Sequence, residues 1–170
     1  MEPHTALESS TNTTRLVVAD WRVDPEAVAI ACRELVDDAT AVRLLVPAWL
    51  HGLDWAGDPW GSVPCAGRQL ESITELCLAA GLDVESSAVG DPDPVSAICD
   101  AVAAGGVGEI LLFARGRHVS LGYPLSVASR AARLAGLPLR SFATALPPRA
   151  QRRRHFAGGH CERSQTPQLA

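Results

Sequence analysis

Two polar segments of this sequence could contact a small ligand that carries negative charge. Asp20 comes directly after the apolar run 16–19, and the segment 114–125 (ARGRHVSLGYPL) precedes a stretch with helical spacing. Unpaired N–H groups at the start of a helix attract anions, and the arginines at 115 and 117 add positive charge. The alternative is that 114–125 is only a solvated connection that ends in a helix cap. The residues alone favour neither interpretation.

These segments belong to a region that alternates apolar runs with amphipathic stretches, which predicts a layered α/β domain. The predicted strands are 16–19, 42–46, 83–89, 109–113 and 139–146. The predicted helices are one from Pro25 with Asp24 as its N-cap, 66–80, one from Val95, and 124–135. Because strands joined by helical crossovers pair in parallel, we expect a parallel sheet. The alternating pattern of 83–89 predicts an edge strand, and the continuous apolar run 109–113 predicts a central one.

The expected sheet brings the two polar segments together. In an open parallel sheet, ligands bind beyond the carboxyl ends of the strands where the strand order reverses. Asp20 follows the first strand and Gly116 follows the fourth. We therefore expect both residues at the carboxyl edge of the sheet.

Composition limits the protein class. The chain has 170 residues, of which 47% are hydrophobic and 20% charged, as is typical of a single globular domain. Residues 15–146 contain 16 acidic and 10 basic residues, whereas 147–170 contain one acidic residue and five arginines. An acidic body argues against general nucleic-acid binding. Residues 1–14 and the basic tail 147–170 lack periodicity, so we predict that both are disordered.

Other sequence signals are weak. No apolar run is long enough for a transmembrane helix and no secretory signal is visible, so a cytoplasmic protein is expected. The five cysteines, including Cys32 and Cys77, have no metal-binding spacing and are interpreted as reduced thiols. We find no recognisable catalytic arrangement and predict that the protein is not an enzyme. Three tryptophans in the segment 47–64 either pack onto the helix 66–80, cover the crevice or contact a protein partner.

The order of these elements resembles the universal stress protein family over residues 15–146. The stretch 89–116 (VGDPDPVSAICDAVAAGGVGEILLFARG) is similar to that family's third helix and fourth strand, and 126–139 (SVASRAARLAGLPL) is similar to its last helix. The resemblance implies a three-layer sandwich with a five-stranded parallel sheet, in the order 3-2-1-4-5, and four main helices.

The resemblance also implies an adenine-nucleotide site in the crevice between the first and fourth strands. Asp20 matches the acidic residue near adenine and ribose, and Val46 is the counterpart of a valine that contacts adenine. The implied cofactor-binding residues are Asp20, Val46, Gly116, Arg117, Ser126 and Val127. The cofactor would be ATP or another adenine nucleotide.

The phosphate-binding pattern of the family, G-x-x-G-x(9)-G-[ST], is incomplete here. Gly116 and Ser126 match it, but Phe113 and Leu125 occupy the other two glycine positions, and the spacing is one residue short. Side chains at these positions obstruct the approach of the backbone to phosphates. We therefore predict that ATP binds weakly or not at all.

The leading interpretation is a non-enzymatic regulatory or stress-response protein that binds an adenine nucleotide weakly. One alternative is a nucleotide-handling enzyme, such as a weak ATPase or a transferase. Another is a pure interaction module that uses the Trp segment 47–64 and the arginine-rich tail. The resemblance further implies a homodimer through the final strand, 139–146, whose exposed edge could pair with a second copy.

Overall fold

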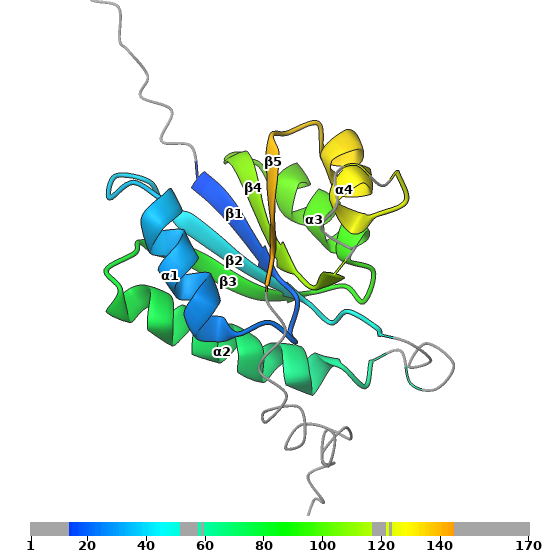
Figure 1. Ribbon diagram of the computed structural model, residues 1–170, viewed down its shortest axis with the longest axis horizontal. Helices are drawn as coiled ribbons and strands as arrows, with labels where there is room; N and C mark the ends of the chain where they lie inside the picture. The colour runs from blue at the N-terminus through cyan, green and yellow to red at the C-terminus, as the bar shows by residue number, and fades with distance from the viewer. Residues whose placement is uncertain (1–13, 52–57, 59, 117–121, 123, 145–170) are drawn as a thin grey trace, which may run out of the picture.

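The structure, a computed structural model, describes residues 14–51, 58, 60–116, 122 and 124–144. Strands and helices alternate along this part of the chain (Figure 1). They are β1 (Thr14–Ala19), α1 (Pro25–Leu35), β2 (Val42–Pro47), α2 (Val63–Ala79), β3 (Val84–Gly90), α3 (Pro94–Ala103), β4 (Val107–Ala114), α4 (Val127–Ala135) and β5 (Leu139–Ala143). The predicted α/β fold, with five strands and four helices in this part of the chain, is confirmed.

The strands form one sheet in the order β3-β2-β1-β4-β5, and every neighbouring pair is parallel. The predicted strand order is therefore confirmed, with β1 in the centre and β3 and β5 at the edges. Helices α1 and α2 pack on one face of the sheet, and α3 and α4 pack on the other. No helix in the described ranges is both long and apolar enough to cross a membrane.

The central strands carry apolar side chains on both faces, as predicted for strands covered on two sides. In β1, Val17 and Ala19 pack toward α1 and α2, whereas Leu16 and Val18 pack toward α3 and α4. Each of these four side chains is at most 1% exposed. By contrast, the five central residues of β3 are exposed, because this strand lies at an edge.

Several element boundaries differ from the predictions. Helix α2 begins at Val63 rather than 66, because Pro64 lies in its first turn, where a missing N–H costs nothing. Helix α4 begins at Val127 rather than 124, because Ser126 is its N-cap and accepts a hydrogen bond from Ser129 N at 3.1 Å. Strand β5 ends at Ala143, and the residues from 145 onward lie outside the described ranges.

The N-terminal boundary also differs by one residue. Thr14, which the sequence placed in a disordered segment, is the first residue of β1 and is 6% exposed. Its hydroxyl donates a hydrogen bond to Glu85 Oε2 at 2.9 Å. The predicted N-cap of α1 is confirmed, because the Asp24 side chain accepts from Glu26 N at 3.2 Å.

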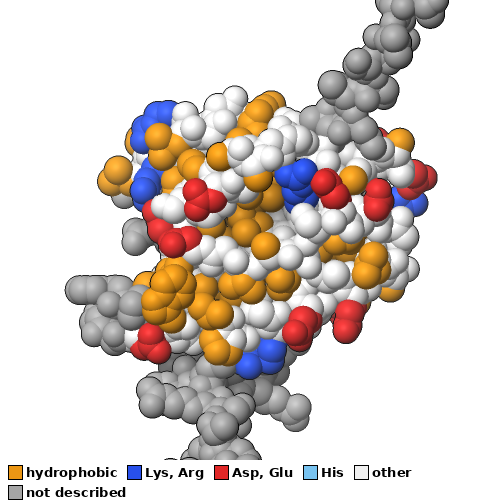
Figure 2. All heavy atoms as spheres, turned by 180° about the vertical axis from the view of Figure 1, so that it is seen from behind, with side chains coloured by type: hydrophobic (Ala, Val, Ile, Leu, Met, Phe, Trp, Pro, Cys, Tyr) orange, Lys and Arg blue, Asp and Glu red, His pale blue; other side chains and the backbone are white. Residues whose placement is uncertain are grey.

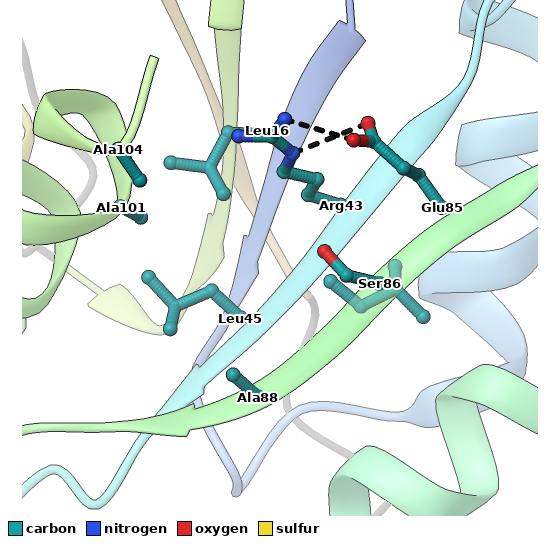
Figure 3. A pocket seen from close by; sticks show the side chains of 9 residues that line it. Leu16, Arg43, Leu45, Glu85, Ser86, Ala88, Ala101 and Ala104 are labelled. Carbon is teal, nitrogen blue, oxygen red and sulfur yellow. Dashed lines mark hydrogen bonds and ion pairs between the residues drawn. The ribbon is translucent and has the colours of Figure 1, made fainter. Parts of the chain in front are cut away.

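A groove of about 420 Å³ lies between β2, β3 and α3. Its floor is apolar, and Arg43 and Glu85 lie at one end (Figure 3). The Arg43 guanidinium donates to Glu85 through Nη2 at 2.9 Å and Nε at 3.2 Å. This hydrogen bonding lowers the pKa of the Glu85 carboxyl below its usual value. Because the guanidinium and the carboxylate are paired with each other, neither charge is left unpaired for a ligand in the groove.

The Arg43–Glu85 end of the groove lies at the amino ends of β2 and β3, whereas Asp20 lies at the carboxyl edge of the sheet. Seen from behind, the molecule shows hydrophobic side chains across a broad part of its surface, with charged side chains among and around them (Figure 2). Because it lies at the opposite end of the strands from Asp20, the groove is distinct from the predicted nucleotide crevice.

We expect Cys32 and Cys77 to react with iodoacetamide at least about a hundredfold more slowly in the native protein than in guanidinium chloride. Both thiols have no exposed surface and lie in the core formed by α1 and α2. The hydrogen bond to Cys77, together with burial, raises the pKa of the Cys32 thiol above its usual range. Peptide mapping by mass spectrometry measures the rates, with the partly exposed Cys65 as an internal control. Equal rates at all three positions would contradict the prediction.

Candidate functional site

Asp20 lies at the carboxyl end of β1, between the ends of β2 and β4. Its backbone N–H donates to Phe113 O of β4 at 2.8 Å, and its own carbonyl accepts from Val23 N at 3.0 Å. These bonds hold the turn after β1 against the neighbouring strand. Gly116 follows the end of β4 by two residues, so Asp20 and Gly116 both lie at the carboxyl edge of the sheet, as expected.

The Asp20 carboxylate is enclosed, and its side chain has 0% exposed surface. Its Oδ1 accepts hydrogen bonds from Arg22 N and from His51 Nε2, each at 3.0 Å. Its Oδ2 is buried and has no hydrogen-bond partner among the described residues. Burying a polar atom without a partner costs about 1–3 kcal/mol, and more for a charged group. The Oδ2 atom is therefore a buried acceptor without a donor among the described residues.

His51 covers this carboxylate and packs between two tryptophans. Its ring stacks on Trp49, with 5.4 Å between centroids and 24° between planes. It meets Trp21 edge-on at 5.6 Å. Trp21 Nε1 also donates to Trp49 O at 2.8 Å, which ties the two tryptophans together. We refer to Asp20, Trp21, Trp49 and His51 as the Asp20 cluster.

The segment that carries Trp49 and His51 is held from two sides. Ala48 N donates to Gly90 O of β3 at 3.0 Å, which extends the pairing beyond the end of β2. The hydroxyl of Ser62, just before α2, donates to Ala48 O. The backbone before His51 is thus fixed to β3 and to the start of α2.

The phosphate side of the predicted site is described only in part. Gly116 is exposed and has a φ of +60°, a conformation that favours glycine. Ser126 and Val127 are 3% and 7% exposed, and the hydroxyl of Ser126 caps α4. Arg117 lies outside the described residues. The binding roles of these residues stay predictions.

Two other predicted residues contribute to the core. Val46 is 1% exposed and packs on the α1/α2 face of the sheet. Phe113 lies within β4, is 2% exposed and stacks on Phe142 with ring centroids 4.9 Å apart. Its ring belongs to the core, and the obstructing role expected of it stays a prediction. Leu125, at the other glycine position of the pattern, is 73% exposed.

His51 is not among the site residues predicted from the sequence. A usable signal existed, because His51 follows the end of β2 by four residues and β2 was expected to be a parallel strand. A polar residue after a neighbouring strand belongs to the same sheet edge as Asp20. Trp49 is 6% exposed, but it packs in the α3/α4 core and not on α2, the helix onto which packing was expected. Trp60 is 61% exposed, and Trp55 lies outside the described residues.

Solved structures of other proteins share this fold. A universal stress protein in complex with cAMP has a TM-score of 0.55 and 17% identity, covering 78% of this chain and 98% of its own. The protein MJ0577, whose structure served to assign its biochemical function, has a TM-score of 0.54 and 14% identity, covering 79% and 99%. A universal stress protein from Archaeoglobus fulgidus has a TM-score of 0.50 and 19% identity, covering 75% and 92%.

No protein-family model matches the sequence, and no curated protein matches it. At identities of 14–19%, the structural similarity shows the fold. This chain therefore has the fold of universal stress proteins, as the resemblance in its sequence implied.

Proposed function

We propose that this chain, which has the fold of universal stress proteins, is a non-enzymatic regulatory or stress-response protein that binds an adenine nucleotide weakly. The site is the crevice at the carboxyl edge, between the ends of β1 and β4. A protein with the same fold was solved in complex with cAMP, which supports a nucleotide as the class of ligand.

The buried Asp20 carboxylate is the observation that carries this proposal. It lies where the strand order reverses, which is where open α/β sheets bind ligands. Its Oδ2 atom has no partner among the described residues, and the exocyclic amine of adenine is a suitable N–H donor. The ring of Trp21, which His51 meets edge-on, offers a surface on which a flat base can pack.

The same geometry supports weak binding. A ligand has to reach a carboxylate with no exposed surface, which requires displacement of a neighbouring group. Leu125 replaces a glycine in the loop pattern, which also lacks one residue of spacing. We expect a dissociation constant of about 0.1–1 mM, or about −5.5 to −4 kcal/mol of binding free energy.

The packing and the hydrogen bonding of His51 favour a binding role over the enzymatic alternative. The ring of His51 is stacked on Trp49, and its side chain is only 12% exposed. In the described ranges, no serine or cysteine is hydrogen-bonded to this ring. A protein partner at 47–64, the other alternative, would meet the exposed Trp60 rather than the buried Trp49.

Calorimetric titration with ATP, ADP, AMP and cAMP tests the proposal, supported by thermal melting. At ten times its dissociation constant, a ligand adds about 1.4 kcal/mol to the stability of the protein. We expect Asp20→Asn to weaken binding at least about tenfold, because the amide NH2 group, a donor, replaces one of the two acceptor oxygens of the carboxylate. The proposal is wrong if none of these adenine nucleotides binds. If ATP binds with a low-micromolar dissociation constant, the expectation of weak binding is wrong.

A further inference from the structure

The nucleotide crevice contains a carboxylate that no ligand can touch in this conformation. The Asp20 side chain has 0% exposed surface, although its Oδ2 atom lacks a partner among the described residues. A ligand atom can reach this oxygen only after one of the groups around it moves. The structure indicates which group that is.

Most of the surroundings of Asp20 are fixed. The bond from Arg22 N comes from the backbone of the turn after β1, which is also tied to β4 through Asp20 N. Trp49 is 6% exposed and packs into the α3/α4 core. Trp21 is held to Trp49 by its indole N–H. Moving any of these groups disrupts the strand ends or the core.

His51 differs from these groups in two ways. It contacts the carboxylate through its side chain, by a hydrogen bond from Nε2 at 3.0 Å, and 12% of that side chain is exposed. It also lies four residues beyond the end of β2, outside any strand or helix. Rotation of its side chain would free Oδ1 of the carboxylate while the backbone stays in place.

We propose that His51 is an internal ligand of Asp20 that competes with the adenine base, so that a nucleotide binds only when the imidazole leaves the carboxylate. This inference rests on the proposed function and explains why binding is weak. Binding exchanges the Asp20–His51 hydrogen bond and the stacking on Trp49 for contacts with the ligand. Removing the imidazole therefore strengthens binding, whereas removing an ordinary binding residue weakens it.

Calorimetric titration with AMP compares the wild type with His51→Ala and His51→Gln. We expect His51→Ala to bind AMP at least about tenfold more tightly, because a hydrogen bond to a carboxylate no longer has to be broken. Gln places an amide N–H near the position of Nε2, so His51→Gln is expected to bind like the wild type. Circular dichroism and thermal melting check that each variant is folded, and His51→Asn, whose shorter amide stops short of Asp20, replaces a His51→Ala protein that fails to fold.

The outcomes separate the two proposals. If the wild type binds AMP and His51→Ala binds equally or more weakly, the role of His51 is wrong and the nucleotide site stands. If no variant binds AMP, ATP, ADP or cAMP, both proposals are wrong. A second measurement follows the imidazole itself, since the NMR signals of His51 in the wild type are expected to shift when AMP is added. Binding that leaves these signals unchanged would show that the ring does not move.

Discussion

Replacing Gly90 with alanine is expected to lower the free energy of unfolding by about 2–3 kcal/mol, which is the cost of an overpacked core. A Cβ atom on Gly90 would lie 2.7 Å from Ala97 Cβ and 2.9 Å from Leu45 Cδ1. The Leu45 side chain can rotate, but Ala97 Cβ is fixed to the backbone of α3. The added methyl group therefore pushes α3 away from the end of β3.

Gly67→Ala is the matched control for this experiment. Gly67 lies within α2, and nothing is within 4 Å of the Cβ position. Alanine is favoured over glycine in a helix by about 0.5–1 kcal/mol, so this variant should be more stable than the wild type. Urea unfolding measures both values. Equal stability of Gly90→Ala and the wild type would show that α3 packs less closely on β3 than the structure indicates.

The Gly90 substitution should also alter the proposed nucleotide site. Gly90 O accepts from Ala48 N, which begins the segment that carries Trp49 and His51. A shift of this strand end therefore displaces the side chains that cover Asp20. We expect the change in stability to be accompanied by a change in tryptophan fluorescence that Gly67→Ala does not show.

The second large effect concerns assembly. We propose that β5 pairs with the β5 strand of a second copy around a two-fold axis, and that Ala143→Pro abolishes this dimer. β5 is an edge strand. Thr144 N donates to Ala114 O of β4 at 3.1 Å. Since backbone direction alternates along a strand, the N–H of Ala143 points away from β4, toward a partner strand. Proline removes that N–H without removing a bond to β4.

Light scattering at tens of micromolar measures this effect. We expect the wild type and the control Ala143→Ser, which keeps the N–H, to have the mass of a dimer, and Ala143→Pro to have half that mass. Circular dichroism confirms that each variant is folded. A monomeric wild-type protein would reject the pairing, and a dimeric Ala143→Pro protein would place the interface elsewhere.

Local residue patterns were sufficient to predict the elements of the fold. The run 109–113 predicted a covered strand, and residues 110–113 belong to the buried part of β4, which is 110–114. Asp24 predicted the start of α1, because a side-chain oxygen before a helix accepts a hydrogen bond from its first turn. The start of α2 was misplaced because Pro64, interpreted as part of a loop, is equally compatible with a first helical turn.

The sequence predicted only those parts of the candidate site that follow from the order of the strands along the chain. The position of Asp20 at the carboxyl edge follows from its place after the first strand of a parallel sheet. Its partner could not be read locally, because His51 is 31 residues away in the sequence. The two meet because β1 and β2 are neighbours in the sheet and end at the same edge.

The sequence by itself determined the α/β class, the parallel sheet, the edge position of 83–89 and the location of Asp20, because each depends on local periodicity or on the order of elements. Tertiary structure alone decided that His51, packed against two tryptophans, binds Asp20, and that the ring of Phe113 faces the core. The second outcome depends on register, because successive side chains of a strand point to opposite faces of the sheet. The aligned motif placed Phe113 in a phosphate loop, whereas its register with Phe142 in β5 stacks the two rings within the core.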